Sequence, residues 1–391
     1  MVWNNSTHSN RTFLSKLALL LLAITVLIFA VAYQKDSLAK PQIDQTSRWQ
    51  TINVNSHVTS TKTPTWKWRQ VKLPGQKKLI AVNFFDEKVG VVVSSEGVIF
   101  KTENGGETWT QSKVAIPEGT HISSASYINS KLGWLGLGGG LYWKGKVLTK
   151  PIPLALHTNN AGASWSTSFT GEEQTSYKVQ FVDEQAGWLT GRGVFHTTDQ
   201  GNHWVKVAVP NEGKDSVYQL YAIDPEKALA LTGDGRVLST EDAGKNWQQI
   251  STLKMPPKDY YDILKIGATA NSSYWVIAGV DSREGMWGQL AHLEKNFSWI
   301  KHEISAVNFR DVFYVTENEV LACGSYMADP KDFGYWDKRD GVILRSLNGG
   351  RDWNFVYRNP EVQSINAFAV LSQDSIWAVG NNGSVVKLLS K

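Results

Sequence analysis

The side chains in this sequence that are best suited to chemistry are arginines and aromatic residues in connections between short apolar segments. A guanidinium donates paired hydrogen bonds to carboxylates, and aromatic rings supply rigid contact area, so the two types together favour recognition of another molecule. We identify as candidate partner-binding residues Arg192, Arg236, Arg283, Trp287, Arg310, Tyr326, Trp336 and Arg339. In a second interpretation these connections pack on one another, and the arginines are solvated or pair with Asp281, Glu284 and Asp340.

Residue patterns that would support catalysis or hold a cofactor are not found. Cys323 is the single cysteine, and the eight histidines show no spacing typical of metal ligands. The sequence has neither the Gly-x-Ser-x-Gly motif of serine hydrolases nor a phosphate-binding loop. A net charge of +4 over 391 residues does not indicate nucleic-acid binding. We therefore expect no catalytic residue, no metal, no cofactor and no nucleic-acid partner.

A turn motif that leads into a tryptophan occurs five times and sets the expected architecture. Each copy has Ser or Thr, then Asp or Asn two residues on, Gly four on and Trp seven on. The Asp or Asn can accept bonds from backbone N–H groups in the turn, and the Gly permits a positive φ. The pattern resembles the Asp-box, or BNR-type, repeat of β-propellers. We expect a structural role, and not metal binding, for its Asn104, Asn160, Asp199, Asp242 and Asn348.

A second repeat lies upstream of each box and delimits the other strands. It places an aromatic or apolar residue two positions before an Asp or Asn, followed by a Gly or Gly-Trp position. Together with a glycine-bearing link and the box turn, it gives four short strands per unit, which is the blade of a propeller. Two units are degenerate, one around 292–299 and one from about 365 to the last residue, Lys391, which lacks a fourth strand.

The missing strand is at the start of the repeat region. Residues 66–74 look like a fourth strand with nothing before it, so we expect them to complete the last blade, with Trp68 beside Val385. The predicted fold class is therefore all-β: a seven-bladed propeller of four-stranded antiparallel blades over 65–391, closed by an N-terminal strand.

Loops in a propeller alternate between two faces. The box turns occupy one face, and the links from second to third strand and from blade to blade occupy the other, which is the usual binding surface. Three links are long and carry aromatic and charged residues, namely 136–153, 279–288 and 324–341. We expect function to concentrate there.

The N-terminal region predicts export. Residues 17–33 are uncharged and apolar and follow Arg11 and Lys16. Residues 1–33 are either a signal peptide cleaved at a small-residue site or a retained membrane anchor, because 17 apolar residues reach the short limit of a spanning helix. Both place the remaining chain in the periplasm or another extracytoplasmic space. Residues 34–64 are polar, and we expect a disordered linker.

The complete pattern over roughly 66–391 is similar to the photosystem II stability/assembly factor family. It reads Phe-x-Asp-x-x-x-Gly-Trp, a glycine link, then Thr-x-Asp-x-Gly-x-x-Trp. The resemblance implies an exported, non-enzymatic, seven-bladed propeller that acts as a scaffold or assembly factor at the membrane surface. Photosynthetic members of the family bind a newly made reaction-centre subunit through an arginine-rich patch, on the lumenal side. The resemblance implies a membrane protein or an assembling subunit as partner. It also implies that the candidate arginines are where such a patch would lie.

A carbohydrate-active protein, either a sialidase-like glycoside hydrolase or a lectin, is the alternative. Asp-box propellers include such enzymes, and Trp287, Tyr326 and Trp336 could stack on sugars. However, the Arg-Ile-Pro segment typical of sialidases is absent, and those enzymes have six blades. Xyloglucan hydrolases with these repeats use two propellers, and this chain has room for one.

Overall fold

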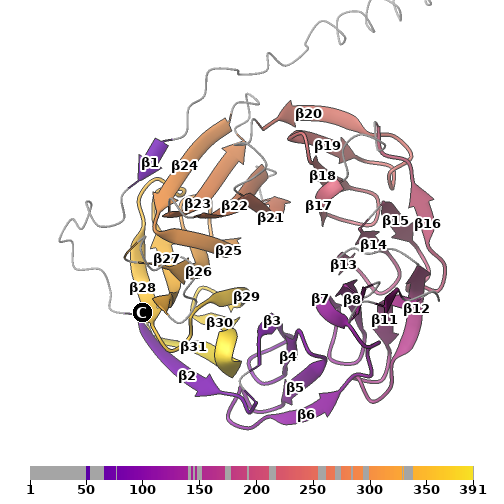
Figure 1. Cartoon of the computed structure of the whole chain (residues 1–391), viewed down its shortest axis with the longest axis horizontal. Coiled ribbons are helices and arrows are strands. Elements are labelled where there is room, and N and C mark those ends of the chain that lie inside the picture. Colours follow the sequence, from indigo (N-terminus) through magenta and orange to yellow (C-terminus); the bar gives the residue numbers. More distant parts are fainter. Residues whose placement is uncertain are drawn as a thin grey trace, which may run out of the picture. The chain divides into compact units, whose positions relative to one another are not determined.

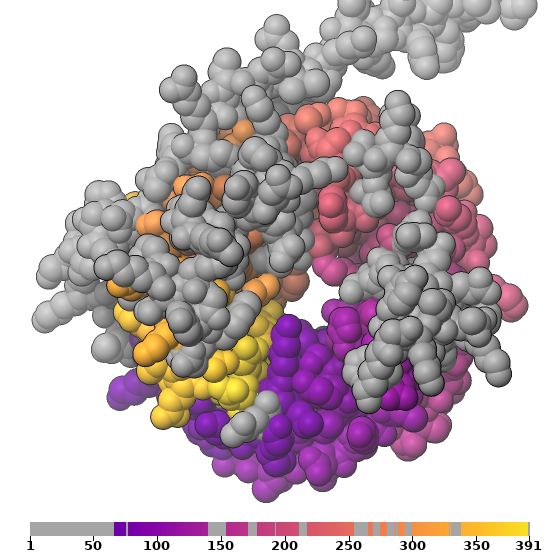
Figure 2. Space-filling view, in the orientation of Figure 1, coloured from indigo at the N-terminus to yellow at the C-terminus, as the bar shows by residue number. Residues whose placement is uncertain are grey.

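The strands of this all-β chain form a ring of seven blades. The computed structural model describes residues 50–52, 66–75, 77–139, 142–143, 146–147, 152–171, 178–191, 193–210, 217–253, 261–268, 274–282, 285–293, 299–327, 329 and 338–390. In the unit that runs from Asp44 to Lys391, each blade is an antiparallel sheet whose first strand is innermost (Figure 1). The space-filling view shows an opening at the centre of the ring (Figure 2). The predicted fold class is confirmed.

Blades 1 to 4 follow one another along the chain. Blade 1 has β3 (Leu79–Phe84), β4 (Gly90–Ser94), β5 (Val98–Thr102) and β6 (Thr110–Lys113). Blade 2 has β7 (Thr120–Tyr127), β8 (Gly133–Gly139), β11 (Ile152–Thr158) and β12 (Ser166–Gly171), with a hairpin of β9 (Tyr142–Trp143) and β10 (Lys146–Val147) in its long link. Blade 3 has β13 (Lys178–Phe181), β14 (Gly187–Thr190), β15 (Val194–Thr197) and β16 (Val205–Val207). Blade 4 has β17 (Val217–Ala222), β18 (Ala228–Thr232), β19 (Arg236–Thr240) and β20 (Gln248–Thr252).

Blades 5 to 7 complete the ring. Blade 5 has β21 (Tyr261–Ala268), β22 (Tyr274–Ser282), β23 (Gly285–Leu293) and β24 (Trp299–Ser305), and β1 (Gln50–Ile52) adds a fifth strand outside β24. Blade 6 has β25 (Val307–Tyr314), β26 (Val320–Tyr326), β27 (Asp340–Ser346) and β28 (Asn354–Asn359). Blade 7 has β29 (Ile365–Ser372), β30 (Ser375–Gly380), β31 (Ser384–Ser390) and β2 (Lys67–Lys72), with a 3-10 turn at Asn381–Gly383 before β31.

The N-terminal strand β2 closes the ring by pairing with β31, as the sequence predicts. The register differs from the expected one: Trp68 pairs with Leu388, and Val71 is the partner of Val385. The N–H of Leu73 donates to the carbonyl of Gly383 at 2.7 Å, which fixes the start of the pairing. A bulge between Lys67 and Trp68 then shifts the far end. The sequence pattern indicates which strands pair but not their register, and the bulge affects only Lys67.

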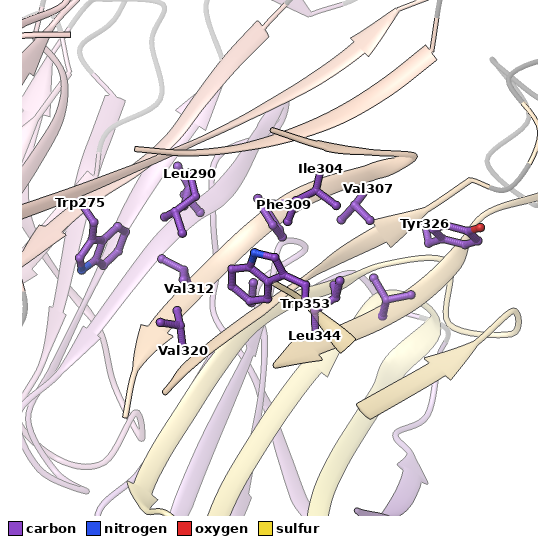
Figure 3. Close-up of a cluster of buried hydrophobic side chains, with 13 residues drawn as sticks. Trp275, Leu290, Ile304, Val307, Phe309, Val312, Val320, Tyr326, Leu344 and Trp353 are labelled. Carbon is purple, nitrogen blue, oxygen red and sulfur yellow. The ribbon is translucent and has the colours of Figure 1, made fainter. Parts of the chain in front are cut away.

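Each box tryptophan packs against the preceding blade. In the cluster of Figure 3, Trp353 of blade 6 lies with Leu290 and Ile304 of blade 5. Between blades 2 and 3, the rings of Trp134 and Phe181 stack with their centroids 3.5 Å apart. The core is therefore divided among the blade interfaces, where aromatic contacts add to the burial of apolar area.

The five boxes share one set of hydrogen bonds. In the first, the Thr102 hydroxyl donates to Asn104 Oδ1 at 3.0 Å and accepts from the N–H of Gly106 at 2.9 Å. Asn104 Oδ1 also accepts from the N–H of Thr108 at 2.9 Å. The same three bonds recur around Asn160, Asp199, Asp242 and Asn348. They satisfy the polar groups of a turn that has few other partners.

The residue before the conserved glycine is also left-handed, which the sequence pattern does not show. Ala161, Gln200 and Ala243 have φ of 63°, 65° and 57°. The backbone N–H of each donates to a carbonyl in the turn between the first two strands, for example Ala243 to Glu226 at 2.7 Å. This bond joins the two turns of a blade at one face and holds a conformation that a Cβ disfavours.

Little of the predicted N-terminal segments lies within the described residues. Residues 1–33 lie outside the described residues, as does 34–64 except for Gln50–Ile52. Those three residues form a strand, in contrast to the linker expected there. In the described part of the chain, no helix has the length and apolar character required to cross a bilayer. The domain boundaries therefore remain predictions.

Candidate partner-binding site

The candidate residues come mostly from links that the sequence analysis assigns to the face opposite the Asp-boxes. The N–H of Gly105 in the first box donates to the carbonyl of Lys88, so the box turn and the turn between first and second strands lie together. The links from second to third strand and from blade to blade are consequently at the other end of the strands. We call this end the link face.

The side chains of four candidates lie outside the described residues. Arg192, Arg283 and Trp336 lie outside the described residues. The backbone of Trp287 belongs to β23, but its side chain is outside the description. For these residues the sequence-based prediction stands as it was made.

Two candidates are buried in blade 6. Tyr326 is 5% exposed, meets Phe355 edge-on at a centroid distance of 5.2 Å and lies under the guanidinium of Arg358. Arg339 is 1% exposed. Both side chains are therefore buried in this structure, and a partner at the surface would not reach them. Position within a link does not reveal which side chain turns inward, so the sequence could not show this.

Arg236 holds the structure of its own link. Its Nε donates to Asp234 Oδ2 at 2.7 Å, and its Nη1 donates to the carbonyl of Pro210 at 3.2 Å. The side chain is only 12% exposed. The second interpretation, that arginines are paired, describes Arg236 well, although its partner is Asp234. Asp340, a partner considered in that interpretation, instead pairs with Arg358.

Arg310 is the described candidate that remains accessible, and it belongs to a group of basic residues. It is half-buried on β25, the innermost strand of blade 6. Desolvation and the positive charge of Arg310 lower the pKa of Lys78, at the start of blade 1, while Glu96 raises it. Lys78 in turn contributes, after desolvation, to the lowered pKa of His121 on β7. Like charges from different blades are thus held near one another.

Two further lysines lie on innermost strands of other blades. Lys178 on β13 donates to Gln219 Oε1 at 2.8 Å, and Lys265 on β21 donates to Asp311 Oδ1 at 2.7 Å. We name Lys78, Lys178, Lys265 and Arg310 the basic belt. Blades 1, 3, 5 and 6 each contribute one member. Sequence analysis missed the three lysines, because their shared location depends on the ring bringing first strands together.

The metal-ligating and thiol side chains of the described residues form no metal cluster. In this part of the chain, no group of three or more His, Cys, Asp or Glu side chains could hold a metal ion. Cys323 is fully buried, and burial raises the pKa of its thiol, with a smaller contribution from Asp311. A protonated thiol without solvent access is a poor nucleophile.

Known proteins of similar sequence and fold include assembly factors and an enzyme. The chain is 20% identical over 344 residues to the Photosystem II assembly lipoprotein Ycf48 of Synechococcus sp. (strain CC9902), covering 84% of this chain and 78% of the relative. The solved structure of YCF48 bound to D1 peptide has a TM-score of 0.57 at 18% identity, covering 83% of this chain and 97% of that one. The GH74 xyloglucanase from Xanthomonas campestris also has a TM-score of 0.57, at 14% identity, covering 82% of this chain and 53% of the enzyme. At these identities the two structures show the fold alone.

The family is established by a match along the sequence. The sequence profile of the family described as Photosynthesis system II assembly factor YCF48 matches residues 60–168 and 144–255. The two spans together run from residue 60 to residue 255, which is half of the 391 residues. They include four of the five boxes and the closing strand β2. The chain therefore belongs to the photosystem II assembly factor YCF48 family.

Proposed function

We propose that this protein is a non-enzymatic scaffold that binds a membrane protein subunit during assembly, at the outer surface of the membrane. Membership of an assembly-factor family is the observation that carries this proposal. A lipoprotein relative supports an extracytoplasmic location at the membrane, in accord with the predicted export segment at residues 17–33. The described structure contributes the surface that such a role requires.

The basic belt is the feature of the link face that fits this role best. Burial first, and the positive charge of Arg310 second, lower the pKa of Lys78, so these two like charges lie close enough to repel one another. An anionic segment of a partner would relieve that repulsion on binding, so complementary charge favours it over a neutral one. A relative has been solved with a D1 peptide bound, which indicates that a propeller of this family accepts a peptide ligand. We infer that an acidic peptide segment of the partner binds at the belt.

Titration of the full-length protein with labelled peptide tests this function. A D1 peptide is the first probe, because a family member binds one. Its scrambled and amide-for-carboxylate versions are the controls, and fluorescence anisotropy is the readout. We expect saturable binding that weakens as salt rises, and weaker binding of the version without carboxylates. Equal binding of all three peptides, or none, would refute peptide recognition by charge.

The carbohydrate-active alternative rests on the fold likeness to the xyloglucanase. Incubation of the protein with xyloglucan and with a fluorogenic sialoside decides it. The scaffold proposal predicts no hydrolysis above a heat-denatured control. Hydrolysis of either substrate that requires the purified protein, and is absent when the protein is left out, would establish an enzyme instead.

A further inference from the structure

The outer edges of most blades are protected against pairing with another strand. β6 and β16 are only 4 and 3 residues long. A register shift interrupts each of four other outer ladders, which end in β12, β20, β28 and β2. Short strands and bulges are the usual means by which a sheet edge avoids unwanted partners. Among the described strands, six of the seven outer edges have one of these two protections.

The outer strand of blade 5 has neither protection. β24 spans seven residues, from Trp299 to Ser305. Its ladder with β23 runs through seven consecutive pairs without a register shift. A long strand without a register shift is the kind of sheet edge that can accept an extended chain.

The burial of β24 is that of an internal strand. Lys301 and His302, which are neighbours and so point to opposite faces, are 5% and 3% exposed. The outer strand β6 is exposed at all four positions, and β28 and β2 have no buried position. In the structure, β24 is therefore covered on both faces and is not an open edge strand.

The chain itself supplies that fifth strand. β1 pairs with β24 in parallel, with Gln50 opposite His302, Thr51 opposite Glu303 and Ile52 opposite Ile304 (Figure 1). Thr and Ile are strand-forming residues in an otherwise polar segment. A parallel pairing is possible because β1 belongs to a distant part of the chain and not to a hairpin.

We propose that the outer edge of β24 is a strand-binding site and that Gln50–Ile52 of the same chain is its occupant. The N-terminal segment is then attached to the ring at two places, by β2 on blade 7 and by β1 on blade 5. Three residue pairs form a weak ladder, so the effective concentration of the tethered segment is what keeps the edge occupied.

A cysteine pair at one register position tests the site directly. Thr51→Cys with Glu303→Cys, in the full chain, places two thiols on paired residues of neighbouring strands, a spacing that a disulfide accepts. The matched control is Thr51→Cys with Ser112→Cys, which offers the same N-terminal thiol to the exposed, short edge strand β6. Cys323 is fully buried and remains in both variants.

Mild oxidation followed by non-reducing electrophoresis gives the result. We expect an intrachain disulfide in the first variant, formed about tenfold faster than in the control because pairing raises the local thiol concentration. Equal rates in both variants would overturn the site. A disulfide-linked dimer whose yield rises with protein concentration would show that a second copy supplies the strand, and would overturn the same-chain assignment.

Hydrogen exchange provides an independent readout without cysteines. Thr51→Pro removes an N–H from β1 and should increase exchange at the N–H groups of β24 that point away from β23, by about tenfold. The control, Thr59→Pro, lies outside β1 and should leave exchange unchanged. Unchanged exchange in Thr51→Pro would contradict the proposal, whatever the outcome of peptide binding at the basic belt.

Discussion

Asp311 on the innermost strand of blade 6 accepts a hydrogen bond from the backbone N–H of Phe368 on the innermost strand of blade 7, at 3.0 Å. The other oxygen of the same carboxylate accepts from Lys265 Nζ of blade 5 at 2.7 Å and from the N–H of Val312 at 2.8 Å. One buried carboxylate thus connects three consecutive blades. Inner strands are sheet edges, so their outward N–H groups need partners that the sheet does not supply.

The same relationship recurs between blades 2, 3 and 4. Ser124 Oγ accepts from the N–H of Val179 at 2.9 Å, and Gln180 Oε1 accepts from the N–H of Ala222 at 3.0 Å. In each case a side chain of one blade satisfies the inner strand of the next. These contacts hold the inner strands that carry the basic belt.

Replacing Asp311 should destabilise the ring more than replacing its lysine partner. Asp311→Ala leaves the N–H groups of Phe368 and Val312 without their acceptor, so we expect a loss of about 2–3 kcal/mol in the free energy of unfolding. Lys265→Gln should cost less than about 1 kcal/mol, because the lysine side chain is 43% exposed. Chemical denaturation measures both. Equal costs would show that the ion pair, and not the backbone bonds, is the main contribution of Asp311.

The left-handed alanines of the boxes predict stabilising substitutions. Ala161→Gly and Ala243→Gly each remove the strain of a Cβ at φ of 63° and 57°, which should exceed the entropic cost of the glycine by about 0.5–1 kcal/mol. Ala163→Gly is the control, since Ala163 is exposed in the same turn as Ala161 and is not left-handed. It should destabilise or have no effect. A loss of thermal stability in the first two variants would contradict this account of the turn.

Ring closure predicts a large effect from the N-terminal strand. Trp68 Nε1 donates to the carbonyl of Val356 at 2.8 Å, and the indole meets Tyr357 edge-on, so β2 is attached to blade 6 as well as to blade 7. We expect Trp68→Ala to lower the free energy of unfolding by about 3 kcal/mol, and Trp68→Phe by about 1 kcal/mol. Thermal unfolding of the two variants checks the order. No change in Trp68→Ala would mean that β2 does not stabilise the ring.

Acidification should weaken the fold through His302. Burial, followed by the charges of Arg351 and His292, lowers the pKa of this 3% exposed histidine below its usual 6.5, although Asp352 opposes this. Because the unfolded chain then takes up a proton that the folded chain does not, the free energy of unfolding falls as pH decreases from above 6.5 towards the folded-state pKa. His302→Gln should flatten this decline. A stability profile between pH 8 and 5 with the same slope in both proteins would refute it.

Architecture was predictable from the sequence because it depends on a repeat, whereas side-chain placement was not. The five boxes and the two degenerate units give seven blades, and the isolated strand at Trp68 gives the closure. Burial of Tyr326 depends on tertiary contacts with Phe355 and Arg358 of β28, which no sequence period indicates. Lys78 and Arg310 are 232 positions apart, and only the closed ring brings their charges together. Gln50–Ile52 was assigned to a linker because three residues carry too weak a strand signal, and its partner edge is a tertiary feature.

The most direct test of the proposed role is peptide affinity after neutralising the basic belt. The variant Lys78→Gln with Arg310→Gln removes two belt charges, and the control Lys131→Gln removes one exposed charge from the opposite face. Titration with a D1 peptide at low and moderate salt, with circular dichroism to verify folding, compares them. We predict at least about tenfold weaker binding and a smaller salt dependence for the belt variant, with wild-type values for the control. Unchanged affinity in a folded belt variant would contradict the account.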